Sequence, residues 1–268
     1  MNRRQHIKLA LSEDQYQKDS TTKILPINKN CKAIIKSKES FYIYGLKWFS
    51  DVFKCVDSST KIKLKVKDGS FVKKNRIVAE LYGTNHVLLG AERVALNYLQ
   101  TMSGAYSKCM SFRKKVTGKN IQLLHTRKTI PLYRLPISEA CTAAGCPPHR
   151  YDLSSSILIK ENHLKLASEP LKLITKAIRK NKKVVVEAKT LRFAKTLSDY
   201  KVDRILLDNF TPAMIKKFLL HNSKVKIEVS GSVNLGNVNK FAIKGIHCIS
   251  IGDLTKNIES KDLSMLIV

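Results

Sequence analysis

Residues 184–208 read VVVEAKTLRFAKTLSDYKVDRILLD and contain one complete structural unit. An apolar run at 184–186 is followed by helically spaced apolar residues over 191–200 and by a second apolar run at 205–207. Short apolar runs are typical of strands buried on both faces, and parallel neighbouring strands are usually joined by a helix. The stretch therefore predicts a strand–helix–strand unit of an α/β fold.

This unit recurs through the second half of the chain. Strands are predicted at 121–124, 157–159, 184–186, 205–207, 225–229 and 249–251, and helices at 170–180, 191–200, 212–221 and 235–244. Such alternation is typical of a parallel α/β barrel or a doubly wound sheet. Every predicted strand is followed by polar or glycine residues, and barrels build their active sites at that end. We therefore interpret residues 109–268 as an α/β barrel domain.

The first 108 residues have a different pattern. A short helix is predicted at 9–14, strands at 31–36, 41–44, 61–67 and 77–82, and a long helix from 88 to about 109. Lys alternates with apolar residues over 61–67, which indicates a sheet with one face in solvent. Residues 1–108 are accordingly predicted to form a separate domain, with an α+β layer arrangement.

Five cationic or potentially cationic side chains surround the predicted strand at 157–159. They are Arg127, Lys128, His149, Arg150 and Lys160. Two adjacent cations in a loop are usually only solvated, and a lone histidine is more often structural. The whole set converging on one strand end instead indicates a pocket for a substrate with several negative charges.

Two acidic residues, Glu187 and Asp208, end successive predicted strands on the opposite side of the expected pocket. Asp208 could simply cap the next helix. Two carboxylates facing a cationic wall also suit magnesium coordination, binding of ribose hydroxyls or stabilisation of positive charge on a sugar ring. This arrangement favours an enzyme that handles a phosphorylated sugar together with a divalent cation.

Glycines follow the last two predicted strands, in Ser230-Gly231-Ser232 and at Gly252. Glycine permits close backbone approach, and amides at a helix start bind phosphate. Either turn alone is a weak signal. Their position matches the place where barrels commonly hold a phosphate.

The net charge of +28 arises from 49 basic and 21 acidic residues, and it would attract polyanions. The lysines are spread along the whole chain and no nucleic-acid recognition motif accompanies them, so no specific nucleic-acid partner is expected. No apolar run approaches the roughly 20 residues of a membrane helix, and no secretory signal is recognisable. The six cysteines form no C-x-x-C pair. We expect free thiols and a cytoplasmic location, with no membrane association.

Short motifs along nearly the whole chain resemble those of the quinolinate phosphoribosyltransferase family, also called nicotinate-nucleotide pyrophosphorylase (carboxylating). They occur in the family's order: Ser12-Glu-Asp14, Asp19-Ser-Thr-Thr22, Glu92-Arg93-Val-Ala-Leu-Asn97, Ser103-Gly104, Thr126-Arg-Lys-Thr129, His149-Arg150, Lys160-Glu-Asn-His163, Leu207-Asp-Asn209, Ser230-Gly231 and Ser250-Ile-Gly252. The resemblance implies an N-terminal α/β sandwich domain followed by an α/β barrel domain, with the last residues returning to the first domain. It also implies phosphoribosyl transfer from phosphoribosyl pyrophosphate to quinolinate, with release of carbon dioxide and pyrophosphate.

Matched position by position, the resemblance implies a role for each site residue. Arg93, Arg127, His149, Arg150 and Lys160 would bind carboxylates and phosphates, and Lys128 would lie near the reacting centre. Glu187 and Asp208 would hold the magnesium–ribose–pyrophosphate part and stabilise an oxocarbenium-like state. The backbone around Ser230, Gly231, Ser232 and Gly252 would receive the 5′-phosphate. Arg93 would come from a neighbouring subunit, which implies a homodimer or hexamer.

Four sites depart from the family pattern. Val185 replaces a Glu, Ser232 replaces a Gly, Ala143-Ala144 replace a glycine pair, and Ile130 and Leu132 flank Pro131 in place of Thr and Gly. Two other interpretations compete with the main one: a related pyrophosphorylase-like enzyme with another base, and a non-catalytic basic binding protein on this scaffold. A binding role alone would not require both Glu187 and Asp208, which argues against the second.

Overall fold

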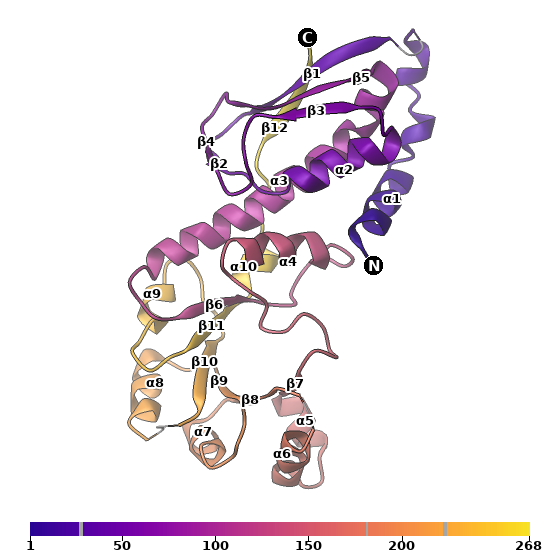
Figure 1. Ribbon diagram of the computed structural model, residues 1–268. Helices are drawn as coiled ribbons and strands as arrows, with labels where there is room; N and C mark the ends of the chain where they lie inside the picture. Colours follow the sequence, from indigo (N-terminus) through magenta and orange to yellow (C-terminus); the bar gives the residue numbers. More distant parts are fainter. Residues whose placement is uncertain (27–28, 181, 222–223) are drawn as a thin grey trace. The chain divides into compact units, whose positions relative to one another are not determined.

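The computed structural model describes residues 1–26, 29–180, 182–221 and 224–268 (Figure 1). The chain divides into two compact units. The first contains residues 1–108, 132–144 and 258–268, and the second contains residues 109–131 and 145–257. The leading segment of the first unit ends at Lys108, and the last residues, 258–268, also lie in that unit. The placement of 132–144 in that unit is not evident from the sequence.

The first unit is built on an antiparallel sheet with the order β12-β1-β5-β3. Its strands are β1 (Asn30–Ser37), β3 (Lys61–Leu64), β5 (Ile77–Thr84) and β12 (Leu263–Ile267), and β2 (Phe41–Tyr42) pairs separately with β4 (Phe71–Val72). Segment 258–268 joins this unit because β12 pairs with β1. The long helix α3 (Asn85–Lys115) starts in this unit, as predicted, and two 3-10 turns (Tyr16–Lys18 and Thr22–Ile24) precede β1.

The strand that was predicted at 41–44 is confirmed only at its first two residues; residues 43–45 are neither helix nor strand, and helix α2 (Leu46–Val56), which was not predicted, follows them. Gly45 has a φ of 108° and ends the extended segment, and Asp68 accepts hydrogen bonds from the amides of Gly45 and Leu46. Apolar residues then recur at helical spacing, and Phe49, Val52 and Phe53 are buried. The helical spacing of apolar residues in α2 covers only a short segment. The aromatic residues just before it favour a strand, so the sequence pattern did not predict this helix.

Helix α1 (Arg3–Glu13) is longer than the predicted helix at 9–14. A capping box starts it: the Asn2 side chain accepts from the Gln5 amide, and the Gln5 side chain accepts from the Asn2 amide. Helix α4 (Arg134–Ala143) completes the unit, where Trp48 donates a 2.6 Å hydrogen bond to Glu139.

The second unit contains a parallel six-stranded sheet with the order β6-β11-β10-β9-β8-β7. Its strands are β6 (Gln122–His125), β7 (Ile157–Ile159), β8 (Val184–Ala188), β9 (Arg204–Asp208), β10 (Lys226–Ser230) and β11 (Cys248–Ile251). All six predicted strands are confirmed: β7 has the predicted bounds, and the ends of the others are shifted by at most two residues. At the β6 edge, Pro148 makes an isolated parallel bridge to His125. This bridge places the following residue, His149, beside the end of β6.

Helices alternate with these strands: α5 (Glu161–Leu166), α6 (Pro170–Ile178), α7 (Leu191–Leu197), α8 (Pro212–Leu219), α9 (Val238–Phe241) and α10 (Asp253–Lys256). The prediction of a helix over 235–244 is wrong in length, since α9 has four residues. The Asn234 side chain accepts from the amides of Gly236 and Asn237 and so forms a turn that competes with helix.

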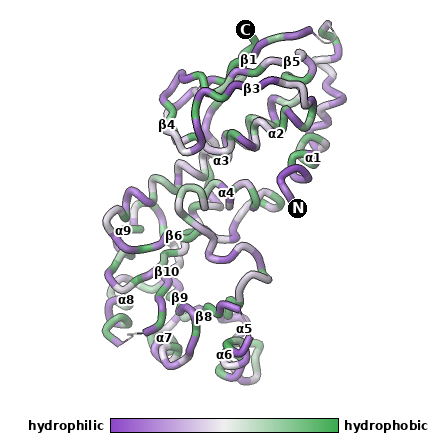
Figure 2. The backbone as a smooth tube through the Cα atoms, viewed as in Figure 1, coloured by the Kyte–Doolittle hydropathy of each residue, from purple (hydrophilic) through white to green (hydrophobic). Residues whose placement is uncertain are grey.

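Strand β8 is apolar over its first three residues and is green in Figure 2 except near its end. Val184, Val185 and Val186 are each at most 2% exposed, so in β8 only the strand end offers a polar group. Within the described residues, no helix is both long enough and apolar enough to span a bilayer.

Candidate active site

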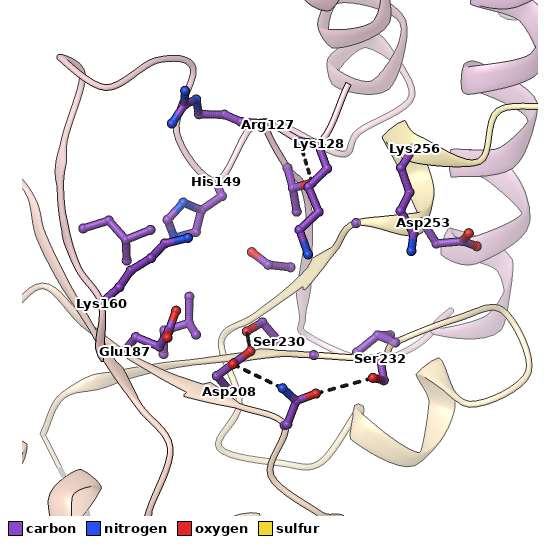
Figure 3. A pocket seen from close by; sticks show the side chains of 18 of the residues that line it. Arg127, Lys128, His149, Lys160, Glu187, Asp208, Ser230, Ser232, Asp253 and Lys256 are labelled. Atoms are coloured by element: carbon purple, nitrogen blue, oxygen red, sulfur yellow. Dashed lines mark hydrogen bonds between the residues drawn. The ribbon is translucent and has the colours of Figure 1, made fainter. Parts of the chain in front are cut away.

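A pocket of about 880 Å³ opens within the second unit at the carboxyl ends of its parallel strands (Figure 3). It is lined by eleven of the predicted site residues: Arg127, Lys128, His149, Arg150, Lys160, Glu187, Asp208, Ser230, Gly231, Ser232 and Gly252. Arg93 is the remaining one. It lies exposed on α3 in the first unit and is not among the described residues that line this pocket.

The loop after β6 directs Lys128 into the pocket. Thr126 Oγ1 accepts a 3.2 Å hydrogen bond from the Lys128 amide, which fixes the turn, and the ammonium group points toward the pocket centre in Figure 3. A Cβ at Gly252 would lie 3.3 Å from Lys128 Cδ. Glycine at this position therefore leaves room for the lysine chain.

Lys160 follows β7 and precedes α5. Its amide donates a 2.9 Å hydrogen bond to His163 Nδ1, which starts the helix and orients the backbone. In Figure 3 the Lys160 side chain extends toward His149, whereas Arg127 points toward the outer rim. The cations therefore surround the pocket at several depths instead of forming one flat patch.

Glu187 and Asp208 lie across the pocket from Lys128, at the ends of β8 and β9, and Lys160 follows β7, the strand next to β8. Asp208 is fixed on both oxygens: Ser230 Oγ donates at 2.8 Å and Asn209 Nδ2 at 3.2 Å. Within the described residues, Glu187 forms neither a hydrogen bond nor an ion pair. Burial, followed by the neighbouring Asp208 charge, raises the pKa of Glu187. Glu187 is thus the carboxylate left available for a ligand.

The turn after β10 depends on a glycine. Gly231 has a φ of 95°, and a Cβ there would lie 2.2 Å from Asn209 Oδ1 and 2.6 Å from the Asn209 amide nitrogen. Ser232 also adopts a positive φ, 52°, at the position where the family pattern has a second glycine. The backbone at Ser232 therefore keeps the conformation that suits a glycine, and this conformation is strained for a serine.

His149 differs electrostatically from the other members of the cationic set. Its pKa is lowered to about 4, first by burial and then by the charges of Arg204, Arg150 and Lys160. The ring is therefore neutral near pH 7 in the ligand-free protein. The permanent positive charge comes from the arginines and lysines.

The sequence reasoning missed several polar groups at this site. Lys189 and Lys256 line the pocket, and Glu228 lies fully buried near it. Lys189 follows Glu187 by two residues, and Lys256 ends the short helix after Gly252. Glu228 interrupts an apolar strand, and that break in the pattern was the available signal.

The metal-binding capacity of the protein alone is limited. Among residues in the described ranges, no group of three or more His, Cys, Asp or Glu side chains is placed to hold a metal ion. Two carboxylates at one pocket edge remain a suitable partial ligand set for Mg²⁺, which commonly takes one or two protein carboxylates together with substrate phosphates.

A parallel β/α fold with a polyanion pocket and two carboxylates at its strand ends defines the class: an enzyme of phosphorylated sugars. The family model described as "Quinolinate phosphoribosyl transferase, N-terminal domain" matches residues 19–103, and that of the C-terminal domain matches residues 107–266. The chain belongs to the quinolinate phosphoribosyltransferase family.

Individual relatives agree with this assignment. A Bacillus subtilis protein named "Probable nicotinate-nucleotide pyrophosphorylase [carboxylating]" is 30% identical over 257 residues, covering 94% of this chain and 89% of its own. A chloroplastic enzyme of that name from Oryza sativa is 31% identical over 97% of this chain and 76% of its own. The crystal structure of nicotinate-nucleotide pyrophosphorylase from Ehrlichia chaffeensis superimposes with a TM-score of 0.94 at 31% identity, covering 100% of this chain and 99% of that one.

Proposed function

We propose that this protein transfers the phosphoribosyl group of phosphoribosyl pyrophosphate to quinolinate, with loss of pyrophosphate and carbon dioxide, and so forms nicotinate mononucleotide for NAD synthesis. One observation carries the proposal. Within a single pocket, Lys128 lies across from Glu187 and Asp208, and Lys160 extends from beside Glu187 toward His149, so the pocket offers cations to an anionic base and carboxylates to a sugar ring that becomes positively charged.

The cationic wall suits quinolinate, a planar dicarboxylate. Arg127 and Arg150 offer planar forks that match carboxylate geometry, and Lys160 supplies a compact charge. Lys128 points to the pocket centre in Figure 3, and it is the group assigned to the neighbourhood of the reacting atoms. In this role these residues bind and orient the base, and their charge stabilises the carboxylate that is retained.

The acidic wall suits the ribose. When pyrophosphate departs, positive charge develops on the sugar ring, and a preorganised carboxylate stabilises it. Asp208 is held by Ser230 and Asn209, so it needs little reorganisation, while Glu187 is free to meet ribose hydroxyls. Magnesium bound by these carboxylates and the substrate would supply countercharge to the pyrophosphate. The 5′-phosphate is assigned to the backbone around Gly231 and Gly252, with Ser230 and Ser232 beside it and Lys256 as a nearby cation.

The proposed function also involves Arg93 and a neighbouring subunit. It is exposed on α3, and we propose that it completes the site of a neighbouring subunit in a homodimer or hexamer. Mixing an Arg93→Ala protein with a Lys160→Ala protein should restore part of the activity through hybrid sites, whereas a fully active monomer in sedimentation would contradict this. No disulfide joins any of the six cysteines, all of which lie in the described ranges; this suits a reducing compartment, and we propose the cytoplasm.

The decisive experiment is to incubate the purified protein with quinolinate, phosphoribosyl pyrophosphate and magnesium and to detect nicotinate mononucleotide, pyrophosphate and carbon dioxide. Omission of any substrate should abolish the product, and omission of magnesium should reduce it strongly. Absence of product under all conditions would overturn the proposal. Nicotinate accepted in place of quinolinate would show a related enzyme that does not decarboxylate.

Binding variants test the cationic wall separately. Lys160→Met should weaken quinolinate binding by about 1.5–3 kcal/mol, because a charge-assisted contact is lost. Lys217→Met is the matched control, since Lys217 is exposed on α8 and does not line the pocket. Calorimetric titration with quinolinate measures both. Equal affinities in the two variants would remove Lys160 from the site.

A further inference from the structure

Glu228 is a buried acid beneath the pocket floor. It lies in β10 and is 0% exposed, and it does not itself line the pocket. An ionised carboxylate is costly in such a place unless charges and hydrogen bonds compensate for lost water. The groups around Glu228 therefore indicate why it is retained.

Glu228 contacts two pocket-lining residues and one cation. Ser250 Oγ donates a short hydrogen bond to Oε1. His149 Nε2 lies 3.3 Å from the same oxygen and makes no hydrogen bond there among the described residues, so this buried nitrogen is left unsatisfied in the ligand-free structure. Arg204 Nε lies 3.3 Å from Oε2, and the other end of that guanidinium donates to Cys248 Sγ at 3.5 Å. Glu228 is thus linked through His149 and Ser250 to whatever binds in the pocket, and through Arg204 to a countercharge.

The protonation states of Glu228 and His149 are complementary. Burial raises the pKa of Glu228 to about 7, although Arg204 and the Ser250 hydrogen bond oppose the rise. Burial and then the charges of Arg204, Arg150 and Lys160 lower the pKa of His149 to about 4. Between these values the ligand-free pair holds one proton, and it resides on the carboxyl group.

We propose that Glu228 is a positioning residue for His149: its carboxyl group faces the unsatisfied Nε2, and it gives its proton up to that nitrogen when an anionic substrate binds. In this step the Glu228 O–H bond breaks and a bond forms between the proton and His149 Nε2. Glu228 becomes a carboxylate facing Arg204, and the imidazolium faces the substrate anion. No proton is gained or lost overall. The identity of the anion, quinolinate, rests on the proposed function.

The proposal has a specific proton balance. At about pH 6 the pair already carries the proton, so quinolinate binding should take up almost none from solution. At about pH 8 Glu228 is ionised and His149 neutral, so binding should take up about one proton. Calorimetry in buffers of different ionisation enthalpy measures this number. Equal uptake by the wild-type protein at both pH values would overturn the proposal.

Glu228→Gln keeps the size and can still hydrogen-bond Ser250, but it cannot supply the proton. Quinolinate affinity at about pH 6 should fall roughly tenfold, with a smaller change in kcat, and proton uptake should become the same at both pH values. Combining it with His149→Gln should cause little further loss, since Glu228 acts through that ring. Additive losses would mean that Glu228 acts independently, as a structural residue, and would overturn the proposal.

Further variants cover the case in which Glu228→Gln does not fold. His149→Gln should abolish the pH dependence of proton uptake, while His221→Gln, at an exposed histidine of the same unit, should retain it. Retention in His149→Gln would overturn the proposal without any change at Glu228.

A ligand-free measurement separates this proposal from the proposed function. If quinolinate does not bind the wild-type protein, the proposed function fails. The ring-nitrogen signals of His149, identified in labelled protein by their loss in His149→Gln, still report its protonation state. These signals should shift between wild type and Glu228→Gln near neutral pH, and unchanged signals would contradict the proposal.

Discussion

The same dipeptide, Ser-Gly, serves different purposes in the two units. In the first unit, Ser103 Oγ accepts from the Tyr44 amide at 3.0 Å and donates to the Tyr44 carbonyl at 3.2 Å, so it satisfies backbone groups. In the second unit, Ser230 donates to the carboxylate of Asp208 at the pocket. Each neighbouring glycine removes a collision: Gly104 with the Glu259 carbonyl oxygen, and Gly231 with Asn209.

The difference teaches that a family motif does not by itself identify a functional residue. The surroundings of each residue decide its role. Ser103 is fully buried and contacts backbone groups, whereas Ser230 lies at the end of a parallel strand and lines the pocket. Apart from Arg93, which is proposed to complete a neighbouring subunit's site, substitutions in the first unit should therefore change stability, and those at the strand ends of the second should change turnover. Measurements of stability and turnover in variants of both units test this division of roles.

The largest effect is expected at the two carboxylates. Glu187→Gln and Asp208→Asn keep size and hydrogen bonding but remove the charge, which should cost about 3–4 kcal/mol in the transition state. Turnover should fall about a hundred- to a thousandfold, with a smaller loss of quinolinate affinity. Steady-state kinetics measures both. Glu169→Gln, at an exposed surface pair with Lys172, is the control and should behave like wild type.

A smaller effect on stability is expected at Gly104. A Cβ there would lie 2.1 Å from the Glu259 carbonyl oxygen, so Gly104→Ala should destabilise folding by about 1–3 kcal/mol. Gly90→Ala is a matched control in the same helix, because its Cβ would meet only ordinary contact, 3.5 Å from the Tyr16 carbonyl oxygen. That change should be neutral or stabilising, since alanine favours helix. Urea unfolding would show whether the signs differ as expected.

The paired serines test the division directly. Ser103→Ala removes the partner of two Tyr44 backbone groups and should cost about 1–2 kcal/mol of folding stability. Ser230→Ala should leave stability nearly unchanged but reduce kcat, because Asp208 loses one of its two hydrogen bonds. A stability loss at Ser230 as large as that at Ser103, with kcat intact, would show that both motifs are structural.

Much of this molecule is predictable from its sequence because periodicity and strand-end chemistry are local. The six parallel strands and the convergence of Lys128, Lys160, Glu187 and Asp208 follow from apolar runs with polar ends. The membership of segment 132–144 in the first unit is not predictable in this way, because it depends on contacts between residues far apart in the sequence, such as Trp48 with Glu139. Glu228 was missed for a similar reason: its partners come from three other segments, and no spacing rule connects them.

The smallest expected effect concerns the residues that replace glycines of the family pattern. Ser232 and Leu132 have φ values of 52° and 59°, a region that costs side chains about 1–2 kcal/mol. Ser232→Gly and Leu132→Gly should each recover up to about 1 kcal/mol, after the greater unfolded-state entropy of glycine is subtracted. Because Leu132 is 77% exposed, its replacement sacrifices little packing, so Leu132→Gly should change thermal stability alone. Ser232→Gly alters a turn that lines the pocket and should also change the KM for phosphoribosyl pyrophosphate. If neither variant is more stable in urea unfolding, the local strain is already relieved by neighbouring contacts. If Leu132→Gly rather than Ser232→Gly alters KM, the division between a structural first unit and a functional second one is wrong.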